Sequence, residues 1–206
     1  LKDLGKLEEA EISTRKAIEL KPDYANAHLN LGAIFRELGK LKEAELSIYE
    51  AIKLNPDLAI AYSSLGNVLR DRGKLNEAEL YQRKAIELNP EVAIVHLNLG
   101  DVLKELGKLK EAELSTRKAI ELNPDCAEAL WNLSLLELLQ GDYKNGLENY
   151  EFRSKTKKPI TPHGQPKIKL VNNQELEKGE KLLVVSEQGL GDTLQYMRYV
   201  PYLRTL

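Results

Sequence analysis

The chain has 206 residues, of which 30 are lysine or arginine and 32 are aspartate or glutamate, so its formal charge is −2. This near-balance argues against a general binder of nucleic acid or of a membrane surface, because either would need a basic excess. The single cysteine, Cys126, excludes an internal disulfide framework and a cysteine-based zinc site. Aromatic residues make up only 6%, so leucine, isoleucine and alanine must form the core, which favours close-packed helices.

The first three quarters of the chain repeat with a period of 34 residues. One glycine, one proline and two alanines recur in successive units, and three residue types held in one register indicate an internal repeat. The glycines are Gly5, Gly39, Gly73, Gly107 and Gly141, the prolines are Pro22, Pro56, Pro90 and Pro124, and the alanines are Ala10, Ala44, Ala78 and Ala112 together with Ala17, Ala51, Ala85 and Ala119.

Each unit is predicted to contain two helices. Residues 59–71 contain no proline, and Gly73 follows them closely, as suits the C-terminus of a helix. Residues 75–88 are the second predicted helix, which ends before Asn89 and Pro90 because proline cannot continue it.

A further glycine falls in the middle of each predicted first helix, where it costs about 1 kcal/mol relative to alanine. We expect it to let the two helices of a unit approach each other closely, opposite a recurrent alanine. The expected pairs are Gly32 with Ala44, Gly66 with Ala78, and Gly100 with Ala112, and the fifth unit has Ser134 and Gly146 at these two places.

This pattern resembles the tetratricopeptide repeat (TPR), whose units carry a Leu-Gly pair, a later glycine, two alanines and a proline. The matching residues of one unit are Leu31, Gly32, Gly39, Ala44, Ala51 and Pro56. The resemblance implies a mainly α fold, a solenoid of helical hairpins wound as a right-handed superhelix over residues 1–153. Its units would be a partial repeat 1–22, full repeats 25–58, 59–92 and 93–126, and a degenerate repeat 127–153.

The fifth unit departs from the pattern. Glu137 occupies the position at which the other units have Phe35, Leu69 and Leu103, and no proline falls in register. Such a departure is typical of a capping repeat, or of one that joins another domain.

TPR families generally line a concave groove with the first helix of each repeat, so the groove is where we expect a protein or peptide partner. One register of the first helices is unusually polar, with Asn30, Ser64, Asn98 and Asn132. Each amide could donate to and accept from an extended peptide backbone, as in the similar asparagine ladder of the protein O-linked N-acetylglucosamine transferases. The alternative is that these side chains bond locally between helices.

Two other registers have simpler interpretations. Arg36, Arg70 and Lys104 are each followed by an acid, which favours a self-compensated, solvated face over a site for an acidic ligand. His28 and His96 share a register that is bulky in TPR proteins, and we interpret them as packing residues.

Composition changes after residue 153. Residues 1–153 hold 21 basic and 27 acidic residues, a net charge of −6, whereas residues 154–206 hold 9 and 5, a net charge of +4. Residues 154–180 form a predicted linker that is rich in proline and lysine. Residues 181–206 then read as a strand (181–187), a glycine-rich turn (188–192) and a helix (193–206), which would open a truncated Rossmann-like α/β domain.

The string from Glu187 to Tyr199 resembles the start of a glycosyltransferase-like domain that follows TPR arrays in many bacterial proteins, and that is similar to the two-Rossmann (GT-B) heptosyltransferases. The resemblance implies that Asp192 is the catalytic base toward an acceptor hydroxyl, and that Gly189 and Gly191 leave room for the ligand. A purely structural alternative is that Asp192 caps the helix. A nucleotide-sugar donor would be the cofactor of the complete protein, but the half of the domain that binds it is absent, so this chain alone should be inactive.

These observations predict the repeat scaffold of a cytoplasmic bacterial glycosyltransferase, which would recruit a protein or peptide acceptor. The alternative is a pure interaction scaffold with a non-catalytic C-terminal domain. We expect no cofactor or metal within this stretch, no nucleic-acid partner, and no membrane span, because no apolar run approaches about 18 residues. The first residue is Leu1 and not methionine, so a targeting signal ahead of it remains open.

Overall fold

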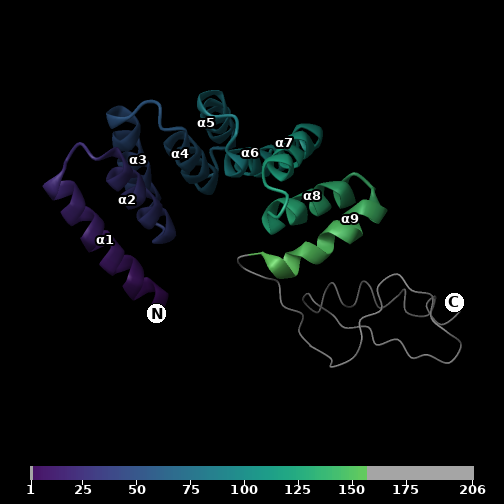
Figure 1. The fold of residues 1–206 in the computed structure, drawn as a ribbon, viewed down its shortest axis with the longest axis horizontal. Coiled ribbons are helices and arrows are strands. Elements are labelled where there is room, and N and C mark those ends of the chain that lie inside the picture. The colour runs from purple at the N-terminus through teal and green to yellow at the C-terminus, as the bar shows by residue number, and fades with distance from the viewer. Residues whose placement is uncertain (1, 157–206) are drawn as a thin grey trace, which may run out of the picture. The chain divides into compact units, whose positions relative to one another are not determined.

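The computed structural model describes residues 2–156, and residues 1–152 form one compact unit. In this part of the chain nine α-helices and one short 3-10 helix follow one another as antiparallel hairpins, without a strand (Figure 1). They are α1 Lys2–Leu20, α2 Ala25–Glu37, α3 Leu41–Leu54, α4 Ala59–Asp71, α5 Leu75–Leu88, α6 Ala93–Glu105, α7 Leu109–Leu122, α8 Ala127–Leu139, α9 Tyr143–Tyr150 and η1 Glu151–Lys155.

The bounds of α4 and α5 confirm the helices predicted for residues 59–71 and 75–88. The predicted all-helical repeat array is thereby confirmed. The predicted strand, turn and helix of residues 181–206, with Gly189, Gly191 and Asp192, lie outside the described residues, as does most of the predicted linker.

The recurrent glycine ends each first helix by adopting a left-handed conformation. Gly39 has a φ of 73°, and the residue after it, Lys40, donates its backbone N–H to the carbonyl of Phe35 at 2.8 Å. This is the glycine-based helix terminus that satisfies carbonyls left over at the end of a helix. The same geometry recurs at Gly73, Gly107 and Gly141, which also have positive φ. Gly5 differs, because α1 runs through it as continuous helix.

The turns between repeats are held by local side-chain bonds. The amide oxygen of Asn55 accepts the backbone N–H of Asp57 at 3.2 Å, and Asn89 makes the equivalent bond. His28 and His96 each place a ring nitrogen within 3 Å of the carbonyl of a proline, at 2.9 Å from Pro22 and 2.7 Å from Pro90. Each histidine therefore links the start of its helix, α2 or α6, to the turn before that helix, which agrees with its interpretation as a structural residue.

The mid-helix glycines do mark close approaches, and the side chain that each one meets belongs to the residue one helical turn beyond the recurrent alanine. A Cβ added to Gly66 would lie 2.8 Å from Nε2 of Gln82, and one added to Gly100 would lie 2.6 Å from Oγ1 of Thr116. At Gly32 the added atom would overlap the side chain of Ile48. The expected approach opposite the recurrent alanine is confirmed at two glycines, because the added Cβ lies 3.2 Å from the carbonyl oxygen of Ala44 at Gly32 and 3.3 Å from that of Ala112 at Gly100. At Gly66 the three nearest atoms all belong to Gln82, one helical turn beyond Ala78.

The hairpins stack so that two layers form within residues 2–150. Each helix packs on the next along the chain, and the first helices α2, α4, α6 and α8 also contact one another in that order. Between them and the second helices lies a core of small and aliphatic side chains, including Leu65, Leu69, Val102 and Leu103. The side chains of the first helices that point away from this core form one continuous face, called here the first-helix face.

Candidate functional site: the first-helix face

The four predicted ladder positions lie on neighbouring first helices, with increasing burial toward the C-terminal end. Asn30 on α2 is exposed, Ser64 on α4 and Asn98 on α6 are half-buried, and Asn132 on α8 is only 8% exposed. The structure therefore brings these residues onto one face, but it does not present them equally to solvent.

Two of the asparagines bond to the preceding repeat. Nδ2 of Asn98 donates to Oγ of Ser63 at 3.0 Å, and Nδ2 of Asn132 donates to Oδ1 of Asp101 at 2.8 Å. These are bonds between helices, as the alternative interpretation of the polar register expects. They leave the carbonyl oxygens of both amides without a hydrogen bond within residues 2–156, so the same side chains retain acceptors for a ligand. Their role as peptide contacts stays a prediction.

The charged register of the first helices is compensated across repeats. Nε of Arg36 lies 2.5 Å from Oδ2 of Asp71, and Nη1 of Arg70 lies 3.2 Å from Oδ2 of Asp101, each pair joining two first helices. Lys104 contributes a further contact to Asp101 at 3.3 Å. The prediction of a self-compensated face is confirmed, because the cations pair with acids of this chain.

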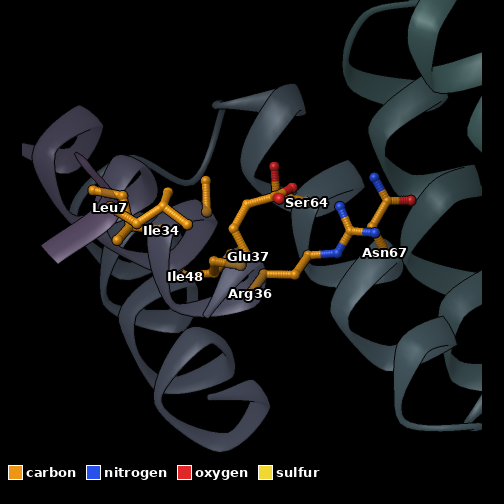
Figure 2. A pocket seen from close by; sticks show the side chains of 8 residues that line it. Leu7, Ile34, Arg36, Glu37, Ile48, Ser64 and Asn67 are labelled. Atoms are coloured by element: carbon orange, nitrogen blue, oxygen red, sulfur yellow. The ribbon is translucent and has the colours of Figure 1, made fainter. Parts of the chain in front are cut away.

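A cavity of about 200 Å³ opens on the first-helix face near its N-terminal end (Figure 2). Ala33 lies beside it, at a position where the next two repeats have Asn67 and Asp101, so a small residue leaves the space open. Leu7, Ile34 and Ile48 supply apolar lining, whereas Arg36, Glu37, Ser64 and Asn67 supply polar groups. The cavity thus combines an apolar surface with hydrogen-bonding groups.

The opposite face carries a register of glutamates that tie each second helix to the next repeat. Glu79 accepts from Nζ of Lys108 at 2.7 Å and from Nη2 of Arg83 at 2.8 Å. Glu11 contacts Lys40, and Glu113 accepts from Gln140, in the same way. Burial raises the pKa of the Glu79 carboxyl, but the bonds from Lys108 and Arg83 outweigh it and hold the pKa below its ordinary value.

Sequence reasoning missed the polar residues that support the first-helix face, namely the buried Ser63 and Gln82 and the half-buried Asp101. A signal for the first two exists in the repeat register. Ser63 stands where other repeats have Leu29 and Leu97, and Gln82 stands where one has Ile48. A polar residue at a position where a neighbouring repeat has a core aliphatic residue is a candidate for a specific role.

Comparison with known proteins identifies the repeats. The profile described as "TPR repeat" matches residues 1–39 and 66–107, and two profiles described as "Tetratricopeptide repeat" match residues 25–58 and 97–151. Together these matches span most of residues 1–151 and end there. The chain therefore belongs to the tetratricopeptide repeat family. Curated protein sequences give no match.

Solved structures of TPR proteins share the fold. PilF of Pseudomonas aeruginosa is 25% identical, with a TM-score of 0.66, over 73% of this chain and 69% of that one. A thermophilic TPR protein of Thermus thermophilus is 24% identical, with a TM-score of 0.66, over 76% and 86%. YrrB, described as a TPR protein with an unusual peptide-binding site, is 24% identical, with a TM-score of 0.56, over 75% and 80%.

Among residues 2–156 no helix combines the length and apolar character needed to cross a membrane. Within the same residues no three side chains of histidine, cysteine, aspartate or glutamate gather as metal ligands do.

Proposed function

We propose that the first-helix face binds an extended peptide segment of a partner protein. The observation that carries this proposal is the register of amides on successive first helices, in which Asn98 and Asn132 keep a carbonyl oxygen without a partner in the described part of the chain. The adjacent cavity could take an aliphatic side chain of the same peptide. The description of YrrB as peptide-binding is consistent with this proposal but is a property of that protein.

The ligand chemistry follows from the charges. Because Arg36, Arg70 and Lys104 are paired within the chain, a strongly acidic peptide would have to displace existing ion pairs. A peptide recognised mainly through its backbone and one aliphatic side chain fits better.

The test uses a peptide of about 12 residues selected from a random display library against the repeat array. Changing Asn30, Asn98 and Asn132 together to alanine should raise its dissociation constant, with each lost bond contributing about 0.5–1.5 kcal/mol. Asn76→Ala, an exposed asparagine on the second helix α5, is the matched control. A peptide that binds both variants equally would contradict the proposed groove.

A second proposal concerns residues 181–206 and rests on the sequence motif alone. We propose that they begin a glycosyltransferase-like domain in which Asp192 is the base, with Gly189 and Gly191 beside the ligand. Asp192→Asn would then reduce turnover about 10²–10⁴-fold in the complete protein with a nucleotide-sugar donor. Full activity of the asparagine variant would leave Asp192 as a helix cap, since asparagine caps about as well as aspartate.

A further inference from the structure

A fully buried polar pair distinguishes the repeat of residues 59–92 from its neighbours. Ser63 on α4 is 1% exposed, and Gln82 on α5 is 0% exposed. The repeat before it has Leu29 and Ile48 at these positions, and the repeat after it has Leu97 and Thr116. The hydroxyl of Thr116 has its hydrogen-bond partner within its own helix, because it donates to the carbonyl of Ala112.

Four side chains form one hydrogen-bonded chain from the core to the first-helix face. Nδ2 of Asn98 donates to Oγ of Ser63 at 3.0 Å, and that hydroxyl donates to Oε1 of Gln82 at 2.8 Å. Nε2 of Gln82 then donates to Oδ1 of Asn67 at 3.0 Å. We call Ser63, Asn67, Gln82 and Asn98 the Gln82 cluster.

One backbone group fixes the direction of every bond in this cluster. Nε2 of Gln82 also donates to the main-chain carbonyl of Ser63 at 3.0 Å, and a carbonyl can only accept. The amide of Gln82 therefore cannot be inverted. Its oxygen must accept from the Ser63 hydroxyl, which in turn accepts from Asn98, while its remaining N–H must meet the oxygen of Asn67.

The two asparagines are consequently oriented in opposite senses. Asn67 turns its oxygen inward, so its NH₂ group, which makes no bond within residues 2–156, is left to donate. Asn98 turns its NH₂ inward, so its oxygen is left to accept. Asn67 lines the cavity described above, where its side chain is visible beside that of Arg36 (Figure 2).

We infer that Gln82 and Ser63 are positioning residues that pre-set one donor, on Asn67, and one acceptor, on Asn98, for the backbone of a bound extended peptide. A peptide carbonyl accepts from the Asn67 amide, and a peptide N–H donates to the Asn98 oxygen. This inference rests on the proposed function. It specifies that the backbone of the peptide forms hydrogen bonds with Asn67 and Asn98 on the first-helix face. Fixing both amides before binding lowers the ordering cost of association.

The repeats themselves supply the variant that tests this inference. Ser63→Leu combined with Gln82→Ile introduces the residues that already fit at these positions, as Leu29 and Ile48 do in the preceding repeat, with Ile48 beside Gly32. Because both partners of the buried bond are replaced by apolar groups, the array should remain folded and as stable as the wild type. Asn67 and Asn98 remain in place but lose the bonds that orient them.

The experiment compares dissociation constants for the library-selected peptide. The double variant should bind about tenfold more weakly, which corresponds to about 1.4 kcal/mol, with an unchanged midpoint of thermal unfolding. Thr116→Ile, the equivalent change one repeat later, is the matched control and should leave the affinity unchanged. In NMR spectra, the side-chain NH₂ signals of Asn67 and Asn98 should move in the double variant and not in the control.

The outcomes separate this inference from the proposed function. If Asn98→Ala weakens binding but the double variant binds as the wild type does, the groove stands and the positioning role is overturned. If no selected peptide responds to Asn98→Ala, the proposed function fails, and the inference fails with it. A double variant that unfolds at a lower temperature would also overturn it, because the cluster would then serve stability.

Discussion

Gly32, Gly66 and Gly100 set the distance between the two helices of a hairpin. Each faces a buried side chain of the second helix, respectively Ile48, Gln82 and Thr116. At Gly32 the neighbour is the fully buried side chain of Ile48. The cost of a glycine in a helix is thus offset by closer packing of the helices.

Gly32→Ala should lower the free energy of unfolding by about 1–3 kcal/mol, because the added methyl group overlaps Ile48. Gly5→Ala is the matched control, since no atom lies within 4 Å of the Cβ that it would add to α1. That change should be neutral or stabilising. Urea denaturation of both variants measures the difference, and equal stabilities would contradict the close approach.

The glutamate register predicts how stability depends on pH. The pKa of Glu79 is held below its ordinary value near 4.5 in the folded state, as are those of Glu11 and Glu113. A carboxyl with a lowered folded-state pKa stabilises the protein above its ordinary pKa and loses that contribution as the pH falls through the lowered value.

Glu79→Gln should therefore lower the free energy of unfolding by about 1 kcal/mol at about pH 6, through loss of the contacts with Lys108 and Arg83. The difference between variant and wild type should shrink as the pH falls below the ordinary pKa and through the lowered one, because the wild-type carboxyl then becomes neutral, as the glutamine is. Denaturant titrations across this range provide the measurement. A difference that stays constant with pH would show that packing, and not charge, is responsible.

At the scale of elements, the hairpin of α8 and α9 is held by a buried charge in place of a core aliphatic residue. The side chain of Glu137 is 4% exposed, and it contacts Arg117 at 3.2 Å and accepts from Asn149 at 2.9 Å. A buried ion pair is weak evidence for stability, since desolvation opposes the attraction. We therefore expect Glu137 to specify which helix faces pair more than to stabilise them.

Glu137→Leu should leave the free energy of unfolding unchanged or raise it by about 1 kcal/mol. Leucine fits the equivalent positions at Leu69 and Leu103, and the half-exposed Arg117 stays hydrated when its partner is removed. Glu137→Ala should lower it by about 2–3 kcal/mol, because it leaves a cavity and removes the partner of Asn149. Thermal unfolding of the two variants distinguishes these effects. A leucine variant as unstable as the alanine variant would make the carboxylate itself the stabilising group.

At the scale of the whole repeat array, each hairpin contacts only its neighbours along the chain. Stability is then approximately a sum of the contributions of single repeats and of the interfaces between them. The core reflects this organisation, because it divides into clusters such as that of Leu99, Leu103, Ala112 and Leu136, which joins the last two repeats.

A chain that ends at residue 126 should still fold, because α2–α5 keep all their neighbours and α6 and α7 keep each other. Its denaturant slope should fall by about one fifth relative to a chain that ends at residue 156, in proportion to the surface buried on folding. The denaturant concentration at the midpoint of unfolding should also fall, because the leucines that contact Leu136 become exposed. Loss of all helical structure in the shorter chain would show that the array folds as one indivisible unit.

The amino-acid sequence alone determined the repeat, the hairpins and the turns, except at Gly5, where α1 continues through the register position that ends the other first helices. The 34-residue register of glycine and proline acts through local backbone preferences, so residues 59–71 and 75–88 became α4 and α5 with the predicted bounds. The register also placed Asn30, Ser64, Asn98 and Asn132 on one face. The proposed role of Asp192 depends on residues outside the described part of the chain.

Only the tertiary structure decided which side chains meet between hairpins. The side chain nearest to Gly66 is that of Gln82, because the crossing of two helices sets which turn of one meets the other. Asn98 reaches back to Ser63 from a residue 35 positions further along the chain, and no local preference encodes that contact. The direction of its hydrogen bonds follows from one buried backbone carbonyl, which becomes an acceptor for Gln82 only when α4 and α5 are packed.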